Sequence, residues 1–263
     1  MPLELLHRLD PVYVEHYRKD TALERVRRDV PQLWPCYRPG SIPQYWAEMS
    51  YSRSEIRVLI FEPKLTVNEQ VFVVHDLNGK FVAFDTDYRL ALKYRHSTDN
   101  EDCWAAFNWA IWIRVQKVEE FNIDPERMAV GGISAGNNLS AVLAHICRDA
   151  HTLLSLQILS RGRFDRANGP YVSYREVEVT PALPTAEIAY RHKHFLRMPR
   201  PARPEDVYEG EAYAEKLKAA GCRTEVMCMP EELHISPHLE DILEMGTLYN
   251  KKVIIAMEKE LAG

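Results

Sequence analysis

Short apolar runs separated by turn residues predict a β-sheet that begins near residue 46. Runs rich in Val, Ile, Phe and Tyr are typical of strands that bury at least one face. The predicted strands are Trp46 to Tyr51, Ile56 to Phe61, Val71 to Val74 and Phe81 to Phe84. Because only the turn at 52–54 separates the first two strands, they predict an antiparallel hairpin.

The middle of the chain alternates between helical and strand patterns. A capping box at Thr98 to Glu101 precedes apolar residues at helical spacing as far as Phe121. Strand patterns follow at Met128 to Gly131 and Leu153 to Leu159, with a helical segment between them. This order of strands and helices predicts the α/β class, with a mainly parallel sheet flanked by helices.

The two ends of the chain complete the predicted organisation. The remaining predicted elements are helices near Pro184 to Leu196, Glu209 to Ala220 and Asn250 to Leu261, and a strand from Thr224 to Met229. Residues 1–45 have a different character, since two helical patterns give way to a proline-punctuated segment. We expect residues 1–45 to form a helical cap or lid and residues 46–263 to form one α/β domain.

The composition indicates partners that are small molecules or proteins. The formal net charge of −5 gives no general attraction to nucleic acid or to an anionic membrane. The five cysteines lie singly, without the C-x-x-C spacing of a zinc site or the pattern of a disulfide framework. The first residues lack the apolar core of a signal peptide, and no stretch approaches the ~18 apolar residues of a membrane span. We expect a cytoplasmic protein.

One pair of histidines has a spacing that metal ligands can use. His192 and His194 are separated by one residue, but the cations Arg191, Lys193 and Arg197 stand beside them. These positive charges would repel a metal ion, so we interpret the segment as a solvated helix face. The sequence predicts neither a metal nor a cofactor.

The most specific chemical signal is the segment Gly132-Ile133-Ser134-Ala135-Gly136, which has the pattern G-x-S-x-G. It lies between a predicted strand and a predicted helix, which is the context that a nucleophile elbow requires. Small residues on both sides of the serine allow the sharp turn that exposes its hydroxyl. Ser134 is therefore the candidate nucleophile.

Several blocks resemble the hormone-sensitive lipase-like carboxylesterases, a family with the α/β-hydrolase fold. Residues 87–91, with the sequence D-Y-R-L-A, are similar to the family's D-Y-R-L-A-P-E block. Residues 122–139 are similar to its nucleophile segment, and residues 209–217 to the helix after its acid strand. Residues 229–234 resemble the P-x-x-x-H context of its catalytic histidine. The resemblance implies that Ser134 is the nucleophile and that His234 is the base.

The chain departs from this family where the oxyanion hole is expected. The family has an H-G-G-G loop after its third strand, whereas here His75 is followed by Asp76-Leu77-Asn78-Gly79-Lys80 and then by the next strand. Five residues cannot form a parallel crossover. Either the two strands form an antiparallel hairpin on the Asn78-Gly79 turn, or one of them lies outside the sheet. The Ala135 amide then remains the main oxyanion donor.

A second departure concerns the catalytic acid. The family position falls on Pro204, and a basic, proline-rich segment replaces the strand expected before it. Glu205 and Asp206 are the nearby carboxylates, and Asp206 is our candidate for the acid. The alternative is that both belong to the exposed start of the next helix, where acidic residues favour the helix dipole.

These features leave three functional hypotheses. The first is a serine esterase that acts on a small acyl ester, with a fold-level analogy to enzymes of specialised metabolism. The second is a protein of the same fold that works as a lyase, cyclase or isomerase, or as a catalytically impaired binding protein. The third is a shortened gene product, because the oxyanion and acid regions are both truncated relative to the family.

Overall fold

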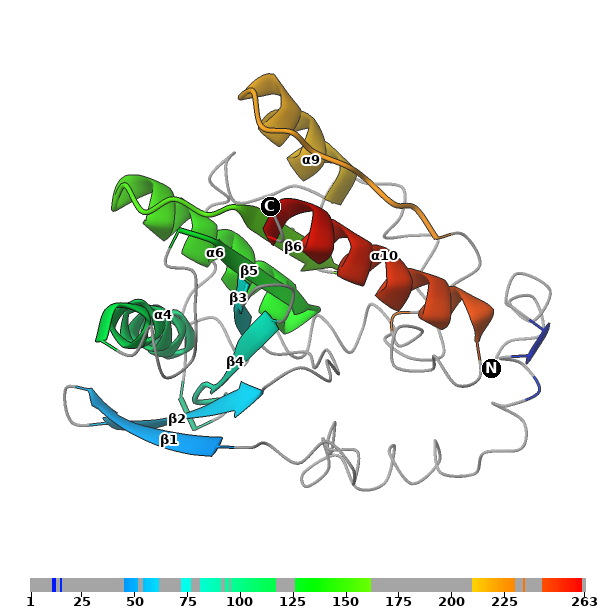
Figure 1. Ribbon diagram of the computed structural model, residues 1–263. Helices are drawn as coiled ribbons and strands as arrows, with labels where there is room; N and C mark the ends of the chain where they lie inside the picture. The colour runs from blue at the N-terminus through cyan, green and yellow to red at the C-terminus, as the bar shows by residue number, and fades with distance from the viewer. Residues whose placement is uncertain are drawn as a thin grey trace.

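The computed structural model describes residues 11–12, 15, 45–51, 54–61, 72–76, 81–90, 93–94, 96–116, 126–161, 210–229, 234 and 243–261. Within this part of the chain, six strands form one sheet and helices lie against both of its faces (Figure 1). The predicted cap at 1–45 falls almost entirely outside the described residues, and so does the helix predicted near Pro184 to Leu196. Both stay predictions.

The strands follow the order β1-β2-β4-β3-β5-β6 across the sheet. Their bounds are β1 Tyr45–Tyr51, β2 Ser54–Phe61, β3 Phe72–Asp76, β4 Phe81–Asp87, β5 Met128–Ile133 and β6 Leu156–Ser160. β1 and β2 pair antiparallel, with Tyr51 opposite Ser54, which confirms the hairpin predicted there.

β3 and β4 are also antiparallel neighbours, with Asp76 opposite Phe81. Only residues 77–80 separate them, and this length permits a hairpin but no crossover. Both strands belong to the sheet, since β4 pairs with β2 and β3 pairs with β5. The first of the two alternatives for this segment is therefore confirmed.

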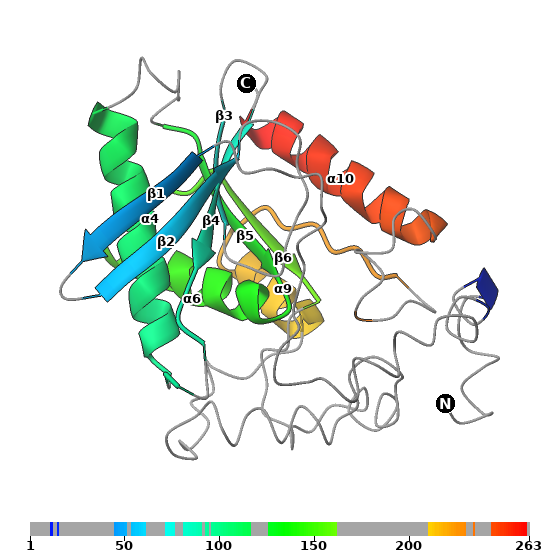
Figure 2. The same cartoon turned by 90° about the horizontal axis from the view of Figure 1, so that it is seen from below.

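The expected α/β sheet with flanking helices is confirmed, although most of its neighbouring strands pair antiparallel. Among the described strands, β5 and β6 pair parallel, while the other four ladders are antiparallel. β2 and β3 are the reason, because each runs against both of its neighbours. For β3, the short connection to β4 forces this direction. β1, β4, β5 and β6 still run in one direction, and the helical crossovers that were predicted from the sequence join β4 to β5 and β5 to β6 (Figure 2).

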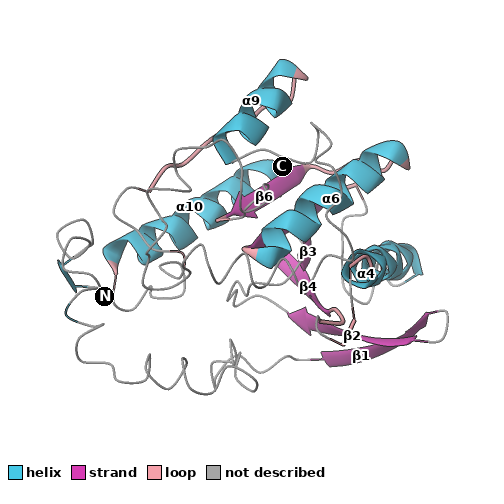
Figure 3. Cartoon of the chain, turned by 180° about the vertical axis from the view of Figure 1, so that it is seen from behind, coloured by secondary structure: helices cyan, strands magenta, loops and turns pink. Residues whose placement is uncertain are grey.

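Four helices complete the described fold. They are α4 Thr98–Gln116, α6 Ala135–Asp149, α9 Gly210–Ala219 and α10 Glu244–Leu261. β6 lies between α6 and α10 when the molecule is seen from behind (Figure 3). No described helix has the length and the apolar character that crossing a membrane requires.

β5 is buried on both faces, as expected for a strand in the middle of a helix-covered sheet. Met128 and Val130 belong to the cluster that β5 forms with Phe84 and with the inner faces of α4 and α6. Ala129 and Ile133 face the other way and pack against α10. Side chains alternate along a strand, so β5 joins two apolar clusters and supports the turn that follows it.

The strand predicted from Thr224 to Met229 is wrong, because these residues have no strand assignment in the structure. A strand needs a hydrogen-bonded neighbour, and residues 224–229 pair with none of the described strands. The apolar pattern here reflects burial instead. Met227 and Met229 pack half-buried against the α10 side of the sheet, whereas Val226 is exposed.

Candidate active site

Ser134 lies in the turn between β5 and α6, the position that its sequence motif predicts. Its backbone has φ 57° and ψ −115°, a conformation that residues other than glycine rarely adopt. Strain of this kind costs of order 1–3 kcal/mol and persists where the surrounding structure fixes it. Ser134 stands at the N-cap of α6, but its side chain makes no capping hydrogen bond. The hydroxyl is therefore directed to another partner.

The two glycines of the motif permit this turn for a steric reason. A Cβ atom added to Gly132 would lie 2.5 Å from the carbonyl oxygen of Gly136 and 2.8 Å from its Cα atom. Contacts this short do not occur between real side chains and backbone, so the strand and the helix can approach only because residue 132 has no side chain.

A backbone hydrogen bond fixes the elbow to the neighbouring strand. The Ser134 amide donates to the carbonyl of Ser160 at 3.0 Å, at the carboxyl end of β6. The parallel register pairs Ile133 with Ser160 just before this point. Ser134 thus lies at the carboxyl edge of β5 and β6, the edge where α/β proteins carry their ligand sites.

His234 is the partner of the Ser134 side chain. Its Nε2 atom lies 2.7 Å from Ser134 Oγ, although 100 residues separate the two in sequence. This distance fits a hydroxyl that donates to the unprotonated nitrogen of a neutral imidazole. The structure therefore brings together the two residues that the sequence predicted as nucleophile and base.

Ala135 is the first residue of α6 and is exposed. The first four amides of a helix have no carbonyl partner within the helix, and they carry the positive end of its dipole. The helical ladder starts one turn later, where the Asn138 amide reaches the Ser134 carbonyl at 3.4 Å. The Ala135 amide is in this way suited to receive developing negative charge beside Ser134.

The other predicted site residues lie outside the described part of the chain. These include the candidate acid Asp206, its neighbour Glu205, and the pair His192 and His194. The assignment of Asp206 stays a prediction. Within the described residues, no group of three or more His, Cys, Asp or Glu side chains is arranged to hold a metal ion.

Two residues beside the elbow were not predicted from the sequence. Ser160 is 5% exposed and Tyr249 is 6% exposed, and the Tyr249 ring packs in the cluster that contains Ile133. Burial raises the pKa of the Tyr249 phenol, while the Ser160 side chain and the Arg161 charge lower it. The one available signal was that Ser160 ends an apolar strand. Nothing in the sequence indicated that a helix 89 residues later would meet it.

Comparisons with known proteins point to one fold family. A family model for the alpha/beta hydrolase fold matches residues 73–208, which is more than half of the chain. Carboxylesterase NlhH of Mycobacterium tuberculosis is 35% identical over 85 residues, a match that covers 32% of this chain and 25% of NlhH. AB hydrolase superfamily protein C1039.03 of Schizosaccharomyces pombe is 28% identical over 222 residues, covering 72% of this chain and 64% of that protein.

Solved structures show the same architecture. A bacterial heroin esterase superposes with a TM-score of 0.75 at 20% identity, and the match covers 97% of this chain and 99% of that one. At this identity the likeness concerns the fold. The sequence matches span about a quarter of NlhH and about two thirds of the yeast protein, so each covers only part of the relative.

Proposed function

The chain belongs to the alpha/beta hydrolase fold family, as its resemblance to the hormone-sensitive lipase-like carboxylesterases predicted, and we propose that it is a serine ester hydrolase. The observation that carries the proposal is the 2.7 Å contact between Ser134 Oγ and His234 Nε2 at the end of a nucleophile elbow. The substrate class is a small acyl ester. Carboxylesterases among the relatives support this choice.

The proposed reaction starts with Ser134. Its hydroxyl oxygen attacks the ester carbonyl while His234 Nε2 takes the proton, and the carbonyl π electrons move to the oxygen. Collapse of this tetrahedral species breaks the bond to the alcohol, which leaves with the proton from His234. Water then attacks the acyl-serine by the same route and releases the carboxylic acid. The sequence of steps needs no cofactor.

The start of α6 is electrostatically favourable for the negative oxygen of the tetrahedral species. The Ala135 amide, at the start of α6, is the donor that we assign to the negative oxygen of the tetrahedral species. Removing one oxyanion donor lowers turnover by about 100-fold to 1000-fold. The turnover number therefore depends on whether a second donor accompanies the Ala135 amide. Asp206 is proposed as the acid that orients the His234 ring.

A second candidate function follows from the hairpin of β3 and β4. That hairpin replaces the segment that supplies oxyanion donors in the resembling family. A protein of this fold with a weakened oxyanion hole could use His234 in a lyase, cyclase or isomerase reaction, or bind a ligand without hydrolysis. Ester hydrolysis stays the first proposal because the serine and the histidine are in contact.

We also propose a cytoplasmic location and, by fold-level analogy alone, a role in specialised metabolism. The free thiols of Cys103, Cys147, Cys222 and Cys228 support a reducing compartment.

A fluorophosphonate probe tests the ester hydrolase directly. Wild-type protein should be labelled, and the Ser134→Ala variant should not. Ser155→Ala is the matched control, because the Ser155 hydroxyl is exposed and donates to the Glu126 carbonyl at 3.4 Å. The proposal fails if folded, monodisperse wild-type protein is not labelled, or if Ser134→Ala is labelled as fast as wild type. Hydrolysis of p-nitrophenyl acetate by the same three proteins gives the corresponding turnover numbers.

A further inference from the structure

Arg161 is the first residue after β6, at the edge of the sheet where Ser134 lies. The residue before it, Ser160, accepts the hydrogen bond of the Ser134 amide. Arg161 is therefore one peptide unit away from the contact that holds the elbow.

The backbone of Arg161 is itself held in an uncommon conformation. Its φ of 48° lies in the left-handed region, as does that of Ser134. For a residue with a side chain this region is unfavourable, because the Cβ atom comes too close to the following carbonyl oxygen. Such a residue keeps its conformation when its surroundings fix it, which points to side-chain contacts that hold Arg161 in place.

The side chain of Arg161 reaches the segment that leads to His234. Its Nη2 atom lies 3.6 Å from the Met229 Sδ atom, within reach of a weak hydrogen bond to the thioether. Met229 in turn packs against the cluster that contains Ile133, the residue before the nucleophile. Arg161 thus contacts the histidine segment where that segment is already fixed to the elbow strand.

Tyr249 closes the arrangement from α10. Its buried ring packs in the same cluster as Ile133. Its phenol lies near both the Ser160 side chain and the Arg161 guanidinium. The elbow, the histidine segment and α10 therefore meet around one arginine.

We propose that Arg161 is a positioning residue of the hydrolase: its guanidinium connects the serine elbow to the segment that carries His234 and keeps the two side chains at hydrogen-bonding distance. The inference rests on the proposed function, since it concerns the same serine and histidine. It assigns Arg161 no contact with the reacting atoms.

The experiment compares four variants with wild type. Arg161→Met removes the guanidinium, Arg161→Lys keeps the charge without the planar fork, and Met229→Leu removes the sulfur at nearly constant volume. Arg148→Met is the matched control, because Arg148 is an exposed arginine of α6 that pairs with Asp149. Steady-state kinetics with p-nitrophenyl acetate and the rate of fluorophosphonate labelling are measured for each.

We expect Arg161→Met to lower kcat and the labelling rate by about 10-fold to 100-fold, because a nucleophile displaced by about an ångström loses this much. KM should stay within about threefold of wild type, the sign of an interaction that matters in the transition state. Arg161→Lys and Met229→Leu should fall between wild type and Arg161→Met, and Arg148→Met should match wild type. A raised KM at unchanged kcat, or unchanged kinetics, overturns the positioning role.

A measurement that needs no turnover separates this proposal from the proposed function. The His234 imidazole resonance, assigned by its loss in His234→Gln, is titrated by NMR in wild type and in Arg161→Met. Displacement of the ring from Ser134 should change its chemical shift and its pKa. Identical titration curves overturn the positioning role even if the wild type hydrolyses esters, and different curves support it even if wild type is not labelled by the probe.

Discussion

The carboxylate of Asp102 accepts hydrogen bonds from both the backbone amide and the guanidinium of Arg89, at 2.9 Å from the amide and 2.6 Å from Nη2. Asp102 lies on α4 with its side chain 1% exposed, and Arg89 follows β4 with its side chain 26% exposed. The hydrogen bond to Asp102 raises the pKa of Arg89. This one carboxylate fixes the segment after β4 to the helix that leads to β5.

We expect Asp102→Asn to lower the free energy of unfolding by about 2–3 kcal/mol, because the variant removes the charge from a buried hydrogen-bonded pair. Asp149→Asn is the control. Its pair with Arg148 has side chains that are 67% and 69% exposed, so a change within about 0.5 kcal/mol is expected there. Urea denaturation measures both. Equal midpoints for the two variants would contradict the assigned role of Asp102.

Gly132→Ala should prevent the elbow from forming. The added Cβ would meet the backbone of Gly136 at 2.5 Å, and neither backbone segment can move without disturbing β5 or α6. We expect the free energy of unfolding to fall by several kcal/mol, or the variant to yield no soluble protein. Gly210→Ala is the comparison, because no atom lies within 4 Å of a Cβ added there. The melting temperatures of the two variants test this expectation. A Gly132→Ala protein as stable as wild type would contradict the steric role of Gly132.

His234→Gln should lower kcat by about 1000-fold or more, since the hydroxyl of Ser134 then has no base. KM should change little, because the imidazole is assigned to proton transfer and not to ground-state binding. The control is His151→Asn, which replaces an exposed histidine at φ 54° by a residue that tolerates this conformation. If His234→Gln retains most of the wild-type kcat, another group is the base.

Ser140→Ala should stabilise the protein. The Ser140 hydroxyl on α6 is fully buried and has no hydrogen-bond partner within the described structure. Removing an unsatisfied buried hydroxyl is worth about 1 kcal/mol, and alanine also favours the helix. We expect the melting temperature to rise by about 2–4 °C. A lower melting temperature would mean that a partner of the hydroxyl exists.

The thiols should differ in reactivity at pH 8. Burial raises the pKa of Cys147 to about 11 and that of Cys103 well above its usual value, so both are protonated at this pH. Cys222 and Cys228 are exposed. Iodoacetamide followed by peptide mass spectrometry should modify the two exposed cysteines first. Rapid modification of Cys147 in folded protein would contradict its burial in the cluster between β5 and α6.

The raised pKa of the Cys147 thiol also predicts how the stability of the protein changes with pH. Cys147 ionises at a higher pH in the folded protein than in the unfolded chain. Its contribution to the free energy of unfolding is therefore constant below the pKa of the thiol in the unfolded chain. Stability then falls as pH rises from about 9 towards 11, where the unfolded state alone is ionised. The raised pKa values of Tyr213 and Tyr249 act in the same direction at higher pH. Unfolding by urea at pH 8 and pH 10 would show the loss.

Local sequence signals predicted much of this fold. The elbow at Ser134 was predictable because glycine spacing, strand and helix all indicated the same turn. For β3 and β4, connection length excluded a parallel crossover and left two alternatives, of which the structure shows the hairpin. The strand predicted at 224–229 was wrong, since an apolar pattern indicates burial but does not supply a hydrogen-bonded neighbour.

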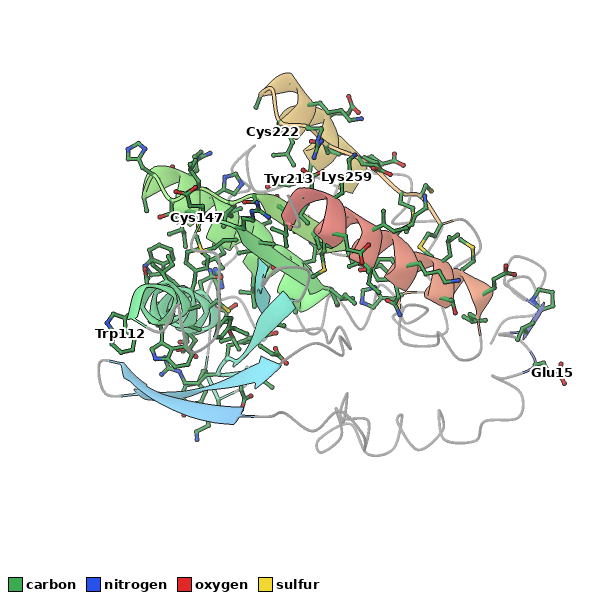
Figure 4. The ribbon with its side chains drawn as sticks, in the orientation of Figure 1. Glu15, Trp112, Cys147, Tyr213, Cys222 and Lys259 are labelled. Carbon is green, nitrogen blue, oxygen red and sulfur yellow. The ribbon has the colours of Figure 1, made fainter. Side chains whose placement is uncertain are left out.

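Long-range contacts were beyond sequence reasoning. The packing of Tyr249 in the cluster beside Ser160 joins segments that share no local pattern. The same holds for the contact of Tyr213 on α9, labelled in Figure 4, with His145 of α6. Trp112 of α4 is exposed, and its side chain projects outward from the helix (Figure 4).

The antiparallel direction of β3 also limits how the proposed oxyanion hole could be redesigned. Phe72 lies opposite Gly131, near the nucleophile, whereas His75 lies opposite Met128 at the far end of β5. β3 therefore ends, and β4 begins, at the edge of the sheet away from Ser134. A glycine loop grafted between β3 and β4 would project from the wrong edge and could not rebuild an oxyanion hole. Engineering of a second donor has to start from the chain that enters β3 before Phe72.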